Sequence, residues 1–297
     1  MATSNLGLKT FGHDEPFDFN EWNDNFVKID TAVGEAKRGK AAYQHLDNSW
    51  FVDPVNQRGQ TSYTGGVYAI DRWKTQIGTN INLMDGFIRI TGDWDARQIL
   101  GNKLIGTYTF AACAKVNVSG EYIQAIELYE NDSNIASSMC TAVGEWKIYT
   151  CTATFTGAND IKNPMVSINN RAGSVSDASI DVKWAAMYEG AYTADTLPAY
   201  VPKGYAAELA ECQRYYKRIR INVALSVSAI YVASSIINMR IRPTATLLKF
   251  DAYGKTVVTD MTGCSLECTA DETLYAVLPT CVEHQVGALS IELDAEL

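Results

Sequence analysis

The stretch GDWDARQ, residues 92–98, carries the side chains best suited to hold a polar ligand. Trp94 has a carboxylate on each side, Asp93 and Asp95, and Arg97 follows closely. Sugar-binding sites stack the apolar face of a pyranose on an aromatic ring and orient its hydroxyl groups with Asp, Asn, Gln or Arg. The stretch therefore predicts a ligand subsite at Trp94. The alternative is a tryptophan folded over the edge of a sandwich, and the sequence leaves both open.

Other aromatic residues are weaker candidates for the same role. Tyr63, within QTSYTGG, and Tyr68 lie in a turn-rich stretch. Tyr253, within DAYGK, has the setting of a hairpin tip that could meet a receptor, although the usual explanation for such a tyrosine is surface exposure. The tryptophans in strand patterns are predicted to lie in the core, and they are Trp73, Trp146 and Trp184.

The residue spacings do not support an enzyme. His13 and His45 lie outside the strand patterns and His284 lies near the end, so no Ser–His or Cys–His pair is supported. Paired carboxylates of the glycosidase kind stay open because such pairs form in space. A depolymerase of the β-helix kind is not supported, since no such repeat is present.

The cysteines match no zinc pattern. They are Cys113, Cys140, Cys151, Cys212, Cys264, Cys268 and Cys281. Cys113 and Cys151 fall in alternating strand patterns, where cysteine packs as a small apolar residue. We expect reduced core thiols, with a bridge between Cys264 and Cys268 as an unsupported alternative.

The net charge of the chain argues against some classes of binding partner. The net charge is −9 over 297 residues, which argues against non-specific binding to nucleic acid or to an anionic membrane. The one basic run, YYKRIR at 215–220, is interpreted as a solvated helix end. No stretch is long and apolar enough for membrane insertion, and the start lacks the pattern of a secretory signal. We therefore expect synthesis in a cytoplasm.

An N-terminal segment, residues 1–45, is predicted to contain one short helix. Asp18 can cap it, with Glu21 three residues on. Apolar residues then follow at alternating spacings of four and three, and they are Trp22, Phe26, Ile29, Val33 and Ala36. This seam favours a short coiled-coil stalk in a trimer or dimer. The alternative is an amphipathic helix packed on its own domain.

Residues 46–204 are predicted to form a β-sandwich or jelly roll. The stretch 46–73 opens it with Trp50 and Phe51 and a turn-rich crossing. Alternation with period two marks antiparallel strands near 108–116, 149–155 and 180–188. Clusters of Gly, Asn and Asp separate them, and no helical pattern intervenes.

Residues 205–297 are predicted to form a smaller β domain that opens with a helix. The helix is expected over 206–219, after the proline-bearing connector TLPAYVP. Strands are expected near 223–231, 244–250, 256–259, 273–278 and 288–293. The expected fold class is therefore mainly β, with a central jelly roll and a smaller C-terminal head.

Several stretches, taken in order, resemble the carbohydrate-binding-module-like jelly roll of bacteriophage tail fibres and related tail-like particles. They are LDNSWFVDPVNQRGQTSY, AIDRW, KLIGTYTFAACAKV and IDVKWAAMYEG, followed by AAELAECQRYYKRI, NMRIRPTAT and DAEL. The opening TSNLGLKT with FNEWNDNFVKIDTAVGE is similar to the start of many such fibres. The resemblance implies a homotrimeric receptor-binding protein at a tail tip, attached to other tail or baseplate proteins through its N-terminus.

The resemblance also implies a structural Ca²⁺ ion, since jelly rolls of this kind often carry one. Asp47, Asn48 and Asp181 lie where it would place hard oxygen ligands, near the first and last strands. Ordinary turn chemistry is the simpler interpretation of these residues. No other cofactor is expected.

The expected function is non-catalytic recognition of a bacterial cell-surface polysaccharide or teichoic acid by a tail fibre. Weak single sites would gain avidity through threefold repetition. Two alternatives stay open: a polysaccharide-degrading tail spike, and a baseplate or connector protein without a receptor.

Overall fold

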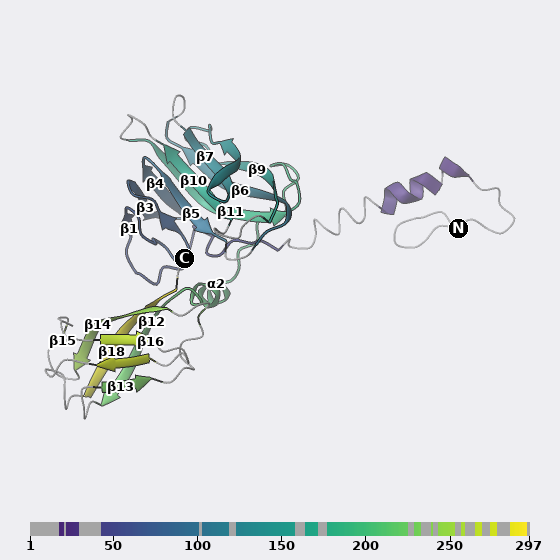
Figure 1. Ribbon diagram of the computed structural model, residues 1–297. Coiled ribbons are helices and arrows are strands. Elements are labelled where there is room, and N and C mark those ends of the chain that lie inside the picture. The colour runs from purple at the N-terminus through teal and green to yellow at the C-terminus, as the bar shows by residue number, and fades with distance from the viewer. Residues whose placement is uncertain are drawn as a thin grey trace, which may run out of the picture.

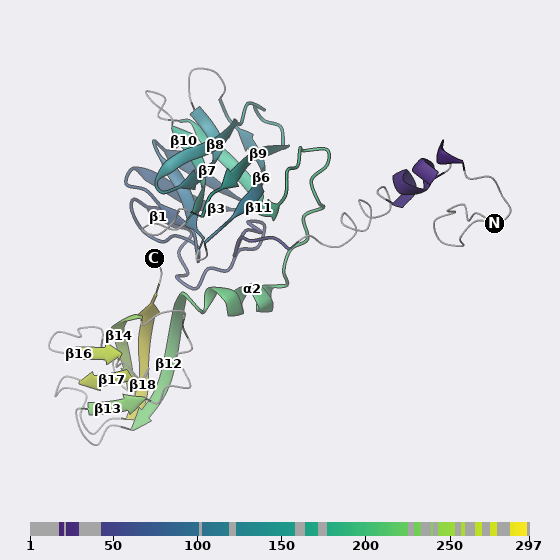
Figure 2. The ribbon, with the colours of Figure 1, turned by 45° about the vertical axis from the view of Figure 1, so that its right-hand side comes forward.

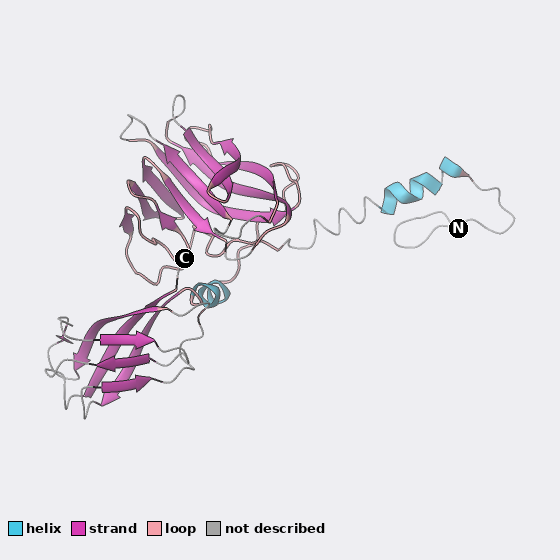
Figure 3. Cartoon of the chain, viewed as in Figure 1, coloured by secondary structure: helices cyan, strands magenta, loops and turns pink. Residues whose placement is uncertain are grey.

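Two antiparallel sheets face each other in the larger part of the chain (Figure 1). The computed structural model describes residues 18–20, 22–29, 43–100, 103–118, 123–157, 164–171, 177–224, 229–232, 239, 243–252, 257–258, 265–268, 274–277 and 286–295. Figure 3 shows that strands dominate these ranges. The expectation of a mainly β chain is confirmed.

The first sheet has six strands in the order β1-β3-β4-β11-β6-β9. Their bounds are β1 (Ser62–Thr64), β3 (Thr79–Met84), β4 (Phe87–Gly92), β11 (Ser179–Glu189), β6 (Gly106–Val116) and β9 (Lys147–Phe155). The second sheet has five strands in the order β2-β5-β10-β7-β8. Their bounds are β2 (Lys74–Thr75), β5 (Asp95–Ile99), β10 (Met165–Arg171), β7 (Ile123–Glu130) and β8 (Ser133–Met139).

The core lies between these sheets. Alternate residues of each strand point inward, such as Ile88 and Ile90 of β4 and Ile126 and Leu128 of β7, and all four are buried. Trp73 is also fully buried, as predicted. The three strands that alternation predicted most clearly coincide with β6, β9 and β11. The sandwich follows because period two gives each strand one apolar face that must be covered.

The start and the end of the sandwich segment meet on β11. The backbone nitrogens of His45 and Phe51 donate to carbonyls of β11, at 3.0 and 2.9 Å. The ring of Tyr200 stacks between Trp50 and Trp184, with centroid distances of 5.5 and 4.9 Å. Trp184 and Trp146 are half-buried on or beside the outer side of the six-stranded sheet, so the prediction that they lie in the core is wrong.

The C-terminal part begins with helix α2 (Tyr205–Cys212) and contains two smaller sheets (Figure 2). One has the order β12-β18-β14-β15 and the other β13-β17-β16. Their bounds are β12 (Tyr216–Ala224), β13 (Ala229–Val232), β14 (Thr244–Ala252), β15 (Val257–Val258), β16 (Ser265–Cys268), β17 (Leu274–Val277) and β18 (Val286–Asp294).

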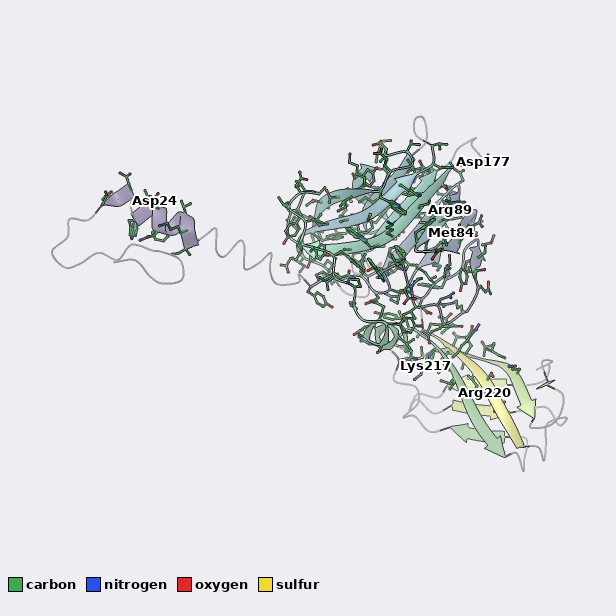
Figure 4. All side chains as sticks on the ribbon, turned by 180° about the vertical axis from the view of Figure 1, so that it is seen from behind. Asp24, Met84, Arg89, Asp177, Lys217 and Arg220 are labelled. Atoms are coloured by element: carbon green, nitrogen blue, oxygen red, sulfur yellow. The ribbon has the colours of Figure 1, made fainter. Side chains whose placement is uncertain are left out.

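The predicted helix over 206–219 is too long, because the chain turns into β12 at Tyr216. Residues 216–224 pair in continuous register with β18, from Tyr216 opposite Asp294 to Ala224 opposite Val286. The basic run therefore lies mainly in a strand and not at a helix end. Lys217 and Arg220 of this strand are labelled in Figure 4. Tertiary pairing overrode a helical spacing of apolar residues.

The two β bodies share a junction built around Arg58. Its guanidinium lies 3.0 Å from the carboxylate of Asp71 and 3.7 Å from the ring centroid of Tyr216 in β12. The side chain of Gln57 donates to the carbonyl of Tyr216 at 2.8 Å, and Arg218 donates to the carbonyl of Arg58 at 3.1 Å. A loop of the sandwich thus binds the first strand of the C-terminal body.

Residues 19–20 and 22–29 are helical, and Asp18 caps them as predicted. The carboxylate of Asp18 accepts from the backbone nitrogen of Asn20 at 2.8 Å. Trp22, Phe26 and Ile29 are all exposed. Val33 and Ala36, the other two residues of the predicted seam, lie outside the described residues. The structure contains a single chain, and its described residues include no coiled coil. In the part of the chain that it describes, no helix is long and apolar enough to cross a membrane.

Four cysteines of the sandwich and of α2 are free thiols, as expected. They are Cys113, Cys140, Cys151 and Cys212. Burial raises the pKa of Cys140 and of Cys151 to about 12, which keeps both thiols protonated.

Candidate functional site

Trp94 lies in the turn between β4 and β5, with 46% of its surface exposed. The backbone on each side of it is fixed. Asp93 donates its N–H to the carbonyl of Gly78 at 3.2 Å, and the carbonyl of Trp94 accepts from the N–H of Asn170 in β10 at 3.1 Å. The ring is therefore presented to solvent from a turn that is tied to two neighbouring segments.

Gly92 makes this turn possible. Its φ is +93°, and a β-carbon there would overlap the carbonyl oxygen of Gly78. Only glycine combines that conformation with so close a backbone approach. Gly78 has a φ of +90°, and a β-carbon there would come 3.4 Å from Cδ1 of Trp94, so Gly78 lies beside the indole.

A cavity of about 480 Å³ opens beside the indole ring. Its volume lies within the range of about 300–1,000 Å³ that is typical of small-ligand sites. The described residues that line it are Gly66, Lys74, Thr75, Gln76, Ile77, Trp94, Arg97 and Ile99. Aromatic, aliphatic, amide and cationic groups thus converge on one space.

Arg97 connects the cavity to the five-stranded sheet, because it lines the cavity and belongs to β5. Asp95 and Arg97 alternate on β5 with Ala96 and Gln98, and of these four residues only Arg97 is not buried. The guanidinium of Arg97 donates to Oδ1 of Asp95 at 2.8 Å. The hydroxyl of Ser167 in β10 donates to the other oxygen, Oδ2, at 2.7 Å. Asp95 is therefore held by donors on both sides.

A second carboxylate group lies one strand further along the same face. Glu127 of β7 accepts from Nδ2 of Asn169 at 3.1 Å and from the hydroxyl of Tyr129 at 2.8 Å. Burial and the hydrogen bond to Glu127 raise the pKa of Tyr129, so its hydroxyl stays a donor. Oδ1 of Asn169 is buried and has no hydrogen-bond partner.

These residues form one set of carboxylate and amide acceptors with guanidinium, amide and hydroxyl donors. Asp95, Glu127, Ser167 and Asn169 are buried, whereas Arg97 and Tyr129 are partly exposed and are the members that a ligand could reach. We name it the polar face and define it by Asp95, Arg97, Glu127, Tyr129, Ser167 and Asn169. Its polar groups are already ordered by one another, so a ligand would not have to organise them.

The structure brings three of the predicted residues together and separates the others. Trp94 and Arg97 line the cavity, and Asp95 supports Arg97. Asp93 is exposed next to Trp94. Tyr253 lies outside the described residues.

Tyr63 does not lie at the surface, and its predicted role as a ligand-stacking residue is wrong. It is 3% exposed, since the middle residue of β1 points into the core. Its hydroxyl donates to Oδ1 of Asn56.

The three residues proposed as calcium ligands are each engaged elsewhere. Asp181 binds Arg89, labelled in Figure 4, at 2.7 and 3.0 Å. Asp47 faces the cations Arg72 and Lys203, each at 3.3 Å. The amide of Asn48 bonds to backbone groups of Val55 and Asp71. Within the described ranges no group of three or more His, Cys, Asp or Glu could hold a metal ion.

Sequence reasoning missed most of the polar face. Glu127, Tyr129, Ser167 and Asn169 of the polar face, and Lys74 of the cavity lining, are placed in one sheet with Arg97 by pairing between β2, β5, β10 and β7. The available signal was the polar residues Ser167 and Asn169 at alternate positions of β10, but both are buried, so the pattern marked neither a solvent face nor a site.

No protein-family model and no curated protein matches the chain. Solved structures similar to it include the carbohydrate-binding module CBM4, with 20% identity over 49% of this chain and 99% of that one and a TM-score of 0.33. A family 16 carbohydrate-binding module has 17% identity over 35% of this chain and 76% of the module, with a TM-score of 0.27. A cyclase from Fischerella sp. TAU has 16% identity over 51% of this chain and 100% of the cyclase, with a TM-score of 0.35. Similarity this distant leaves the functional argument to the side chains of this chain.

Proposed function

We propose that this protein binds a glycan, without cleaving it, at Trp94 and the adjoining polar face. The observation that carries the proposal is an exposed indole fixed beside a cavity of about 480 Å³, with Arg97 and Gln76 in the same lining. An indole face suits the C–H face of a pyranose, and the polar groups around it suit its hydroxyls.

The hydrogen bonds of the polar face favour binding over hydrolysis. Glycosidases need one protonated carboxyl as a general acid. Asp95 accepts from Arg97 and Ser167, and Glu127 accepts from Tyr129 and Asn169. Both carboxylates are therefore held as acceptors by donors of the protein itself, an arrangement that suits binding better than acid catalysis.

The test is calorimetry with a monovalent oligosaccharide, chosen from a glycan array probed with the wild-type chain. Trp94→Ala should weaken binding about tenfold, because the stacking surface is lost. Trp22→Ala is the matched control, since Trp22 is 41% exposed but lies in the N-terminal helix. Equal affinities for wild type and Trp94→Ala would contradict the proposal.

The same proposal includes the biological setting that the sequence resemblance implies. In it, the protein is the receptor-binding fibre of a phage or tail-like particle, and the N-terminal helix joins three copies. An exposed apolar row formed by Trp22, Phe26 and Ile29 supports assembly, because a soluble helix rarely leaves such a row in water. Blocking of particle adsorption by the purified chain would test the receptor role.

Two other functions have distinct signatures. Release of reducing ends from host polysaccharide would favour a degrading tail spike. Silence on the glycan array, together with failure to block adsorption, would favour a connector without a receptor.

A further inference from the structure

We infer that the bound glycan carries an acidic group, a carboxylate or a phosphate, which lies between Lys74 and Arg97. This inference rests on the proposed function and adds the chemical class of the ligand. It comes from the charges around the cavity and not from the aromatic ring.

Lys74 and Arg97 are directly opposite each other on β2 and β5. Both side chains line the cavity beside Trp94. Like charges at opposed cross-strand positions repel each other and destabilise a sheet. A pair of this kind inside a ligand-sized cavity is relieved when an anion binds between the two cations.

Among the described residues, only one of these two cations has a carboxylate partner. Arg97 has the carboxylate of Asp95 at 2.8 Å. Lys74 lies over the ring of Tyr68, 5.2 Å from its centroid, and no carboxylate of the described residues is within 4.0 Å of its ammonium group. The described residues that line the cavity include two cations and no Asp or Glu.

Arg97 also keeps donor capacity for a ligand. Its Nε and Nη2 face Asp95, whereas Nη1 faces the sulfur of Met165 at 3.9 Å. A thioether is a weak acceptor, so a carboxylate or phosphate oxygen would be a much better partner for Nη1.

A third cation lies near the indole. The guanidinium of Arg171 is 5.6 Å from the ring centroid of Trp94. Asp93 and Asp95, the two neighbours of Trp94 in the chain, are the nearest opposing charges in sequence, and Asp95 is paired with Arg97. The surroundings of Trp94 are thus locally cationic on a chain whose net charge is −9, and that contrast selects for an anionic ligand.

The test compares wild type, Lys74→Gln and Lys147→Gln on an array of paired glycans. The array holds oligogalacturonates and their carboxyl-reduced forms, glycerol-phosphate polymers, and neutral bacterial polysaccharides. We expect the wild type to bind acidic members. Lys74→Gln should bind them about five- to tenfold more weakly while keeping any neutral binding. Lys147, exposed on the opposite sheet, is the matched control and should behave as wild type.

The outcomes separate this inference from the proposed function. Binding of carboxylated members alone, or of phosphate polymers alone, supports the inference and identifies the anion. Binding of neutral glycans only, with Lys74→Gln unchanged, overturns the inference and leaves the proposed function standing. If wild type binds no glycan on the array, the proposed function fails, and the inference fails with it. Acidic binding that also falls steeply with salt would agree with the ion pair.

Discussion

The position of the Trp94 indole depends on the glycine that precedes Asp93. Gly92 lets the turn approach the carbonyl of Gly78, where a β-carbon would overlap that oxygen. The backbone hydrogen bonds of Asp93 and Trp94 depend on that approach. The proposed binding residue is therefore placed by backbone geometry, which makes it sensitive to substitutions at residues that do not contact a ligand.

Gly92→Ala should lower the free energy of unfolding by about 3 kcal/mol, because it adds backbone strain and a clash with a carbonyl. Gly86→Ala is the matched control. Its φ is +79°, but nothing lies within 4 Å of an added β-carbon, so its cost should be only about 1 kcal/mol. Urea denaturation measures both. Equal losses in the two variants would show that the close approach to Gly78 does not matter.

Asp71 is the buried carboxyl whose ionisation the fold disfavours most clearly. Burial raises its pKa from 3.8 to about 6, although the backbone N–H of Gln57 and the charge of Arg58 oppose the shift. The folded chain thus holds this proton up to a higher pH than the unfolded chain does. The contribution of Asp71 to stability is fully present below about pH 4 and is lost as the pH rises to about 6.

Asp71→Asn should remove this dependence. Between pH 4 and pH 7 the wild type should lose about 1–3 kcal/mol of stability relative to the variant. Urea denaturation of both chains across that range measures their difference in free energy of unfolding. Taking this difference cancels the contributions of all other titrating groups. Parallel stability curves for the two chains would show that Asp71 has the same pKa folded and unfolded.

At the scale of elements, the strands of the sandwich cover their apolar residues, while the N-terminal helix leaves its apolar row exposed. Trp22 and Phe26 pack edge to face, with centroids 4.7 Å apart, and the row continues to Ile29. Self-association is the simplest way to cover such a row.

Replacing both Trp22 and Phe26 with Glu should convert the proposed trimer to monomer, as light scattering would show. Placing Glu at Asn23 and Val27 introduces the same charges at the same spacing beside the row and should leave the trimer intact. A wild-type chain that is already monomeric at micromolar concentration would remove the stalk hypothesis.

The presence of strands such as β6, β9 and β11 was predictable from the sequence, because an alternation of apolar and polar residues is a local property. The residue at which α2 ends was not predictable from the sequence. Tyr216 and Ile219 fit a helical face equally well, and only pairing with β18 decides between the two. The site was half predictable for the same reason. Trp94 and Arg97 are close in sequence, whereas Lys74, Glu127 and Ser167 join them through register that no local pattern encodes.

At the scale of the whole molecule, the two β bodies are tied through one arginine. Arg58 forms an ion pair with Asp71 in the sandwich and packs on the ring of Tyr216 in the second body. Its guanidinium also lies 3.8 Å from the carboxylate of Asp294. The same contact that holds a buried charge therefore also sets how the bodies meet.

Arg58→Ala should lower the free energy of unfolding by about 2–4 kcal/mol, since it leaves Asp71 buried without its cation. It should also broaden the distribution of distances between the bodies in small-angle X-ray scattering. Arg214→Ala is the matched control, because Arg214 is exposed in a pair with Glu211. Its cost should stay below about 1 kcal/mol. An unchanged scattering profile for Arg58→Ala would show that other contacts set the arrangement.

The stacking of Tyr200 between Trp50 and Trp184 has a consequence for how such a chain can evolve. It brings the two ends of residues 46–204 to one spot on β11, where Lys203 also bonds to the carbonyl of Leu46 at 3.3 Å. A folded unit whose ends meet can be replaced by another domain during evolution, because the replacement need not alter the separation of the flanking parts. Under the proposed function, exchange of residues 46–204 alone would change the ligand while the N-terminal helix and the C-terminal body stayed the same.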